Sequence, residues 1–181
     1  MNCWKTISIE NDFGKERLWF LSATMMIAYF MFFFVIFRTF VSTATLEDLG
    51  ILFLLITLII VIPLHLFLHC LPIWISGKKA SFGFRKKQWP YFYFSTKLPL
   101  TKQLIIISTS SPVIVITSAS IIASIIYPQW VHYIAMMSAL NFGLCIYDIV
   151  TIKHLMSAPK ESFIEEHGDG YHILYYNQTI Q

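Results

Sequence analysis

The chain has 181 residues, of which 56% are hydrophobic and only 13% are charged, with a net charge of +3. Ordinary globular proteins carry roughly 25% charged residues, so this composition excludes a soluble domain and indicates a chain whose main solvent is lipid. The three cysteines, Cys3, Cys70 and Cys145, have no regular spacing, and the last two fall in apolar runs, which argues against a disulfide framework.

Four apolar runs are long enough to cross a bilayer, whose core of about 30 Å needs about 20 residues of helix. They are residues 18–37, 49–74, 104–127 and 131–152. Between the second and third runs, residues 79–100 mix basic and aromatic side chains, which predicts strands at the membrane surface. Near the end, Asp169–Gly170 is a turn signal between β-forming residues and predicts a hairpin. The expected fold class is therefore a mainly α polytopic membrane protein with two small β segments.

The positive charge is distributed unevenly around these runs. Twelve of the thirteen lysines and arginines precede the first run, follow the fourth or lie between the second and third, whereas Arg38 alone lies between the first and second. Because basic residues accumulate on the cytoplasmic side, we expect a multi-pass protein of the cell membrane with both termini in the cytoplasm. The predicted parts are a membrane domain, residues 1–152, and a cytoplasmic tail, residues 153–181.

Two histidines, His65 and His69, stand four residues apart in the second run. Residues at this spacing share one helix face, so both imidazoles could reach one metal ion. Ionisable groups within lipid are costly and usually have a partner or a function. The alternative is that each histidine is neutral and donates a hydrogen bond to a neighbouring helix.

The fourth run adds a possible third ligand. Asn141, Cys145 and Asp148 lie on one helix face, and Asp148 is the only acid well inside any of the four runs. Counting the helical rise from the cytoplasmic ends places Asp148 at a depth similar to that of His69. Two imidazoles and one carboxylate form the three-ligand pattern of an open zinc site. The alternative is a protonated Asp148 that donates a hydrogen bond to a serine of the third run.

Four segments occur in the chain in the order HLFLH, WPYFYFSTKLPLTKQLIIISTSSP, NFGLCIYD and APKESFIEEHGDG. In these segments and their order the chain resembles a family of small bacterial membrane proteins described as zincin-like membrane peptidases, which are distantly similar to site-2 intramembrane metalloproteases. By this resemblance, His65 and His69 match the paired zinc ligands and Asp148 matches the acidic ligand. Asn141 matches a polar position two turns before that acid.

Leu66 departs from the family pattern. In the HExxH motif of zinc peptidases, the residue after the first histidine is a glutamate that takes a proton from the metal-bound water. Leucine cannot do this, and such general-base help is worth roughly 10² to 10⁴ in rate. The carboxylates of the tail are interpreted as ordinary solvated charges; they are Glu161, Glu165, Glu166 and Asp169.

Three functions remain open from the sequence. The first is a degenerate member of the family that binds a divalent ion, expected to be zinc, has weak or no proteolysis and acts on other membrane proteins by binding them. The second is an active membrane metallopeptidase whose base comes from elsewhere. The third is a structural or regulatory membrane protein without metal. Nucleic acid is not expected as a partner, because anionic lipid headgroups account for the basic segment 79–100.

Overall fold

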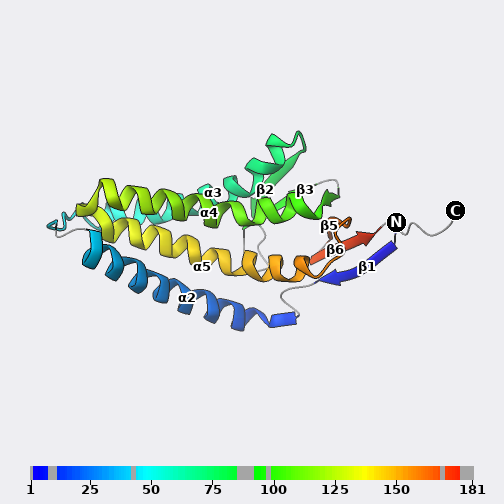
Figure 1. The fold of residues 1–181 in the computed structure, drawn as a ribbon, viewed down its shortest axis with the longest axis horizontal. Coiled ribbons are helices and arrows are strands. Elements are labelled where there is room, and N and C mark those ends of the chain that lie inside the picture. Colours follow the sequence, from blue (N-terminus) through cyan, green and yellow to red (C-terminus); the bar gives the residue numbers. More distant parts are fainter. Residues whose placement is uncertain are drawn as a thin grey trace.

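Four long helices lie side by side and a small sheet covers one end of the bundle (Figure 1). This computed structural model describes residues 2–7, 12–41, 44–84, 92–96, 99–167 and 170–175. The helices are α2 (Lys15–Ile36, continued by the π-helix η1, Phe37–Val41), α3 (Ile51–Ile75), α4 (Lys102–Ile126) and α5 (Val131–Met156, preceded by the 3-10 helix η2, Pro128–Trp130). Within the described residues, these four helices are long and apolar enough to cross a membrane. The four predicted spans are confirmed.

The bundle is arranged around α5, which packs against α2, α3 and α4. Large apolar side chains point away from the bundle, as Phe20 and Phe32 do on α2 and Ile59 on α3. Small and polar residues lie inside, among them Ala139 and Ser138 on α5. Lipid solvates the outer apolar surface, whereas small residues at the contacts let the helices approach closely.

The contact between α2 and α5 is close at Gly143. The Ser22 hydroxyl donates a hydrogen bond to the carbonyl of Gly143, and about two helical turns further along α2 the Tyr29 hydroxyl lies 2.9 Å from Ser138 Oγ. A Cβ atom on residue 143 would lie 3.2 Å from Met26 Cβ and 3.4 Å from the Ser22 carbonyl oxygen. Glycine therefore sets how closely these two helices can approach.

We expect Gly143→Leu to destabilise the protein, because a branched side chain here would push α2 away from α5. Over-packing of this kind typically costs about 1–3 kcal/mol. The measurement is the thermal unfolding temperature of the purified protein in detergent, which should fall. Ala119→Leu is the matched control. Ala119 is exposed on α4, so this substitution places the same leucine on the outer surface. Equal unfolding temperatures for the two variants would contradict the prediction.

The sheet that covers the bundle end is built from distant parts of the chain. Its four strands are all antiparallel, in the order β1 (Asn2–Ile7), β6 (Gly170–Tyr175), β5 (Phe163–His167) and β4 (Leu100–Thr101). The predicted C-terminal hairpin is confirmed as β5 and β6, with His167 paired to Gly170; Asp169, at its expected turn, lies outside the described residues. The additional strands β1 and β4 were not predicted, and they widen the hairpin into a sheet.

A second, smaller hairpin lies between α3 and α4, where surface strands were predicted. Its strands are β2 (Ala80–Phe84) and β3 (Phe92–Thr96), and residues 85–91 between them lie outside the described residues. The indole of Trp74, near the end of α3, donates a hydrogen bond of 3.0 Å to the carbonyl of Ala80. This bond ties the hairpin to α3. The location of the hairpin at a membrane surface stays a prediction.

One apolar cluster joins the sheet to the helix ends. Its buried members come from all four helices, from three strands and from the segment after α5; they are Leu18, Ile73, Leu100, Ile105, Val150, Leu155, Ala158, Ile164 and Ile173. Lys102 Nζ adds polar contacts of 3.1 Å to the Met156 carbonyl and 2.6 Å to the Ala158 carbonyl, at the C-terminus of α5. The sheet thus draws strands from both predicted parts, 1–152 and 153–181, whose division stays a prediction.

At the opposite end of the bundle, Asp48 and Tyr133 fix the start of α3 against α5. The Tyr133 hydroxyl donates a hydrogen bond of 2.5 Å to Asp48 Oδ1, the Gly50 amide donates one of 2.8 Å to the same oxygen, and the Leu49 amide donates one of 2.9 Å to the Tyr133 hydroxyl. The hydrogen bond from Tyr133, followed by that from Gly50, lowers the pKa of Asp48. The carboxylate form therefore stabilises this end.

Candidate metal centre

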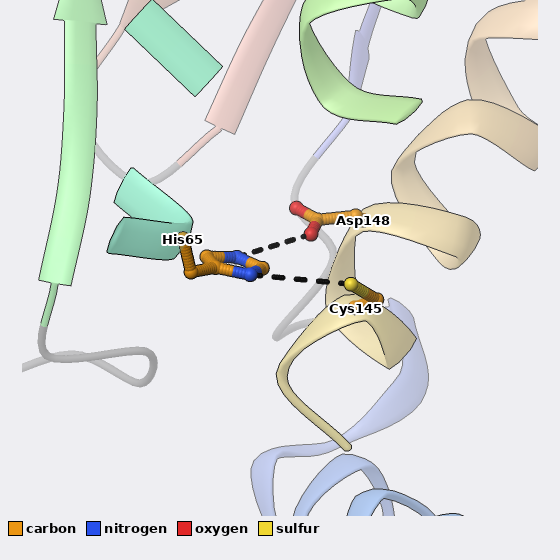
Figure 2. A group of neighbouring side chains, drawn as sticks. All are labelled: His65, Cys145 and Asp148. Carbon is orange, nitrogen blue, oxygen red and sulfur yellow. Dashed lines mark hydrogen bonds and ion pairs between the residues drawn. The ribbon is translucent and has the colours of Figure 1, made fainter. Parts of the chain in front are cut away.

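His65, His69 and Asp148 meet inside the bundle. Asp148 Oδ2 lies 3.4 Å from the Nε2 atom of each histidine, and the two Nε2 atoms lie 3.0 Å apart. His65 is 7% exposed, His69 2% and Asp148 8%. Figure 2 shows His65 of α3 with its ring directed at Asp148 of α5. The structure therefore brings together all three residues that the sequence suggested as ligands.

The position of these residues follows from the helical repeat. Along α3 the buried side chains include Val61, His65, His69 and Ile73, which recur every four residues and form the inward face. His69 lies about 9 Å from the end of α3, and Asp148 about 12 Å from the end of α5, at 1.5 Å per residue. The common depth that the sequence predicted is thus present, in the half of the bundle nearest the sheet.

Hydrogen bonds to the other ring nitrogens fix how the imidazoles are protonated. His69 Nδ1 lies 3.0 Å from the Ser108 carbonyl oxygen, which can only accept, so Nδ1 carries the proton. His65 Nδ1 lies 2.9 Å from Asn141 Oδ1. The amide of Asn141 donates through Nδ2 to the Pro112 carbonyl at 3.3 Å, which turns its oxygen toward His65. In the neutral form of each ring, Nε2 therefore presents its lone pair to the interior.

Pro112, inside α4, makes both of these contacts possible: its carbonyl orients Asn141, and its missing N–H frees the Ser108 carbonyl. Proline has no N–H, so the carbonyl four residues earlier, that of Ser108, loses its partner within the helix. That free carbonyl accepts the hydrogen bond from His69, and the Ser108 hydroxyl in turn donates one of 2.5 Å to the His69 carbonyl. Sequence reasoning missed Ser108 and Pro112. The signal was present as a proline four residues after a serine within a membrane span.

The three inner atoms have the spacing of metal ligands. At zinc–nitrogen and zinc–oxygen distances of about 2.0–2.1 Å, two ligand atoms of a tetrahedral site lie about 3.3 Å apart. The three measured separations are 3.0, 3.4 and 3.4 Å. Asp148 Oδ2 is buried and has no hydrogen-bond partner among the described residues. Three lone pairs that converge in this way repel one another unless a metal ion or a proton lies between them.

Cys145 is a fourth donor that the sequence analysis placed on the face of Asp148 but did not consider as a ligand. Its Sγ lies 4.0 Å from His65 Nδ1, and donor atoms of His65, Cys145 and Asp148 all lie within 4.8 Å of one another. Figure 2 shows the sulfur and the carboxylate approaching the His65 ring from the same helix. Of the two possible sets, the set with His69 has the shorter separations and better fits three ligands of one small ion.

Position 66, where the HExxH motif has its catalytic glutamate, is apolar in the structure. Leu66, one residue after His65, is buried on α3. Glu161 and Glu165 are exposed beyond the end of α5, as expected of solvated charges. The side chains of Glu166 and Asp169 lie outside the described residues.

The model of a protein family described as "Putative zincin peptidase" matches residues 58–163, more than half of the chain. The chain belongs to this family. The resemblance noted from the sequence is thereby confirmed. The part that matches the zincin-peptidase family runs from α3 to the start of β5 and contains His65, His69, Pro112, Asn141 and Asp148. No curated protein and no solved structure gives a significant match to the chain.

Proposed function

We propose that this member of the zincin-peptidase family is a membrane protein that binds one zinc ion through His65, His69 and Asp148 and has weak or no peptidase activity. One observation carries the proposal: two imidazole Nε2 atoms and one carboxylate oxygen, all buried, converge at separations of 3.0–3.4 Å with their lone pairs inward. Zinc is the preferred ion, because it takes imidazole and carboxylate ligands in tetrahedral geometry.

The outer contacts support a site made for a metal. Histidine ligands in metalloproteins typically donate their second N–H to a carbonyl or carboxylate, which holds the ring and raises the basicity of the binding nitrogen. Here the Ser108 carbonyl accepts the hydrogen bond from His69 Nδ1, and the Asn141 amide oxygen accepts the one from His65 Nδ1. In this role, zinc would polarise whatever occupies its remaining position.

The leucine at position 66 is the reason that we propose weak or no proteolysis. Without a carboxylate at this position, a bound water lacks the proton acceptor that glutamate provides in the HExxH motif, and hydrolysis loses roughly 10² to 10⁴ in rate. On this proposal the protein acts by binding other membrane proteins rather than by cutting them. The distribution of basic residues supports an orientation with the sheet, and with it the metal-binding half of the bundle, toward the cytoplasm.

The proposal is tested by metal analysis of the chain purified in detergent. We expect about one zinc per chain after incubation with zinc and dialysis, and a fall in the unfolding temperature when a strong chelator removes the zinc, since a ligand that binds only the folded state stabilises it. A chain that retains no zinc and whose unfolding temperature does not respond to zinc would overturn the proposal.

A further inference from the structure

We infer that Cys145 is the fourth protein ligand of this ion, so that the site is closed and electrically neutral. The inference rests on the proposed function and extends it, because it assigns the position that a hydrolytic zinc site leaves open for water. It also gives the site an affinity for soft, thiolate-binding divalent ions such as cadmium and cobalt as well as zinc.

The place of Cys145 in the structure supports this role. It lies three residues before Asp148 on α5, so the two side chains share a helix face. The residue is fully buried, and its sulfur lies within 4.8 Å of donor atoms of both His65 and Asp148. Its contact of 4.0 Å with His65 is to Nδ1, the nitrogen that faces Asn141, so ligation beside Nε2 requires the sulfur to turn toward Asp148. A sulfur and an oxygen ligand of one tetrahedral zinc ion lie about 3.5 Å apart, given zinc–sulfur distances of about 2.3 Å, so the sulfur has to approach Asp148 by no more than about 1.3 Å. Rotation about the single χ1 torsion of cysteine can bring the sulfur closer without movement of the backbone.

A second, independent observation is the state of Asp148. Its Oδ2 atom is buried without a hydrogen-bond partner among the described residues, yet it lies 3.4 Å from both Nε2 atoms. A buried carboxylate oxygen in an apolar bundle needs a cation or a donor. The orphaned oxygen therefore points to a bound ion, and Cys145 belongs, with His65 and Asp148, to a group of donors close enough to hold one.

The charge balance decides between a thiolate and water at the fourth position. A divalent ion with one carboxylate and two neutral imidazoles carries a net charge of +1, which is costly inside a membrane. A cysteine that coordinates a metal loses its proton, and the resulting thiolate brings the total to zero. A bound water would reach the same neutrality only as hydroxide, and buried Leu66 offers no acceptor for the proton that would have to leave. Neutrality therefore favours sulfur.

The test is the absorption spectrum of the full chain loaded with Co²⁺ in detergent. Thiolate ligation gives an intense sulfur-to-cobalt charge-transfer band in the near ultraviolet, which nitrogen and oxygen ligands do not give. We expect this band in the wild type and in Cys70→Ser and Cys3→Ser, and its loss in Cys145→Ser. Cys70 is the matched control, because it is equally buried and lies on α3 beside His69.

A binding titration with Cd²⁺ completes the test, with an expected loss of affinity of at least about 10²-fold in Cys145→Ser, as for the removal of one of four ligands. Cys145→Ala provides a second variant if the serine variant does not fold. Cobalt bound by the wild type without the charge-transfer band would overturn the fourth-ligand assignment and leave the proposed function intact. Failure of the wild type to bind cobalt, cadmium or zinc would overturn both.

Discussion

Replacement of His69 by alanine is expected to weaken zinc binding by about 10²–10³-fold. Structural zinc sites bind with about 10–16 kcal/mol, which is about 2.5–4 kcal/mol for each of four ligands. Every 1.4 kcal/mol corresponds to a factor of about ten in affinity. His69 is a proposed ligand whose ring is buried and is held by the hydrogen bond from its Nδ1 to the Ser108 carbonyl. The measurement is a competition titration against a chromophoric chelator.

His132→Ala is the matched control for this experiment. His132 is also on a membrane-spanning helix, but it lies at the start of α5, at the end of the bundle opposite to the sheet. Asp148→Asn is a second ligand variant that preserves the shape of the side chain while it removes the charge. Zinc affinity in His69→Ala and Asp148→Asn equal to that in His132→Ala would contradict the ligand assignment and favour the interpretation in which the polar residues only hold helices together.

Pro112→Ala is expected to weaken zinc binding by about 10- to 100-fold, the usual effect of losing a partner behind a metal ligand. Alanine restores the N–H at position 112, which can then bond to the Ser108 carbonyl and compete with His69 for it. At the same time alanine is favoured over proline within a helix by about 3 kcal/mol. The metal-free protein should therefore unfold at the same or a higher temperature while its zinc affinity falls.

A fall in zinc affinity without a fall in the unfolding temperature of the metal-free protein distinguishes a positioning role of Pro112 from a general loss of structure. Both quantities are measured on the same preparation, by thermal unfolding after chelation and by zinc competition. Pro72→Ala serves as the control, since Pro72 also interrupts a membrane-spanning helix but lies near the end of α3. Zinc affinity in Pro112→Ala that is unchanged, or that falls only together with the unfolding temperature of the metal-free protein, would count against the role.

The proposed site differs from that of a hydrolytic zincin at two positions. Leu66 removes the acceptor for the proton of a bound water, and on our inference Cys145 removes the water itself. Each change by itself would impair hydrolysis, and together they describe a site that holds an ion rather than one that activates a nucleophile. In such a protein the metal would tie α3 to α5, beside the hydrogen bonds that tie α3 to α4.

The sequence by itself determined the membrane spans and the three candidate ligands. A span needs only enough consecutive apolar residues, and this property is local in the chain. The face shared by His65 and His69 follows from the helical repeat, and the match in depth with Asp148 follows from the helical rise. The C-terminal hairpin could also be predicted locally, because only two residues separate its two strands along the chain.

Only the tertiary structure decided how these parts meet. The pairing of β1 with β6 joins the two ends of the chain, and no local pattern encodes the partner of a distant strand. The bond from His69 to the Ser108 carbonyl involves the backbone of another helix, which becomes available because Pro112 lacks an N–H and α4 packs against α3. The distance of Cys145 from His65 depends on how α3 and α5 pack together. The sequence specifies which side chains a helix carries, whereas the packing of the helices determines which side chains are neighbours. The chemistry of this site depends on those neighbours.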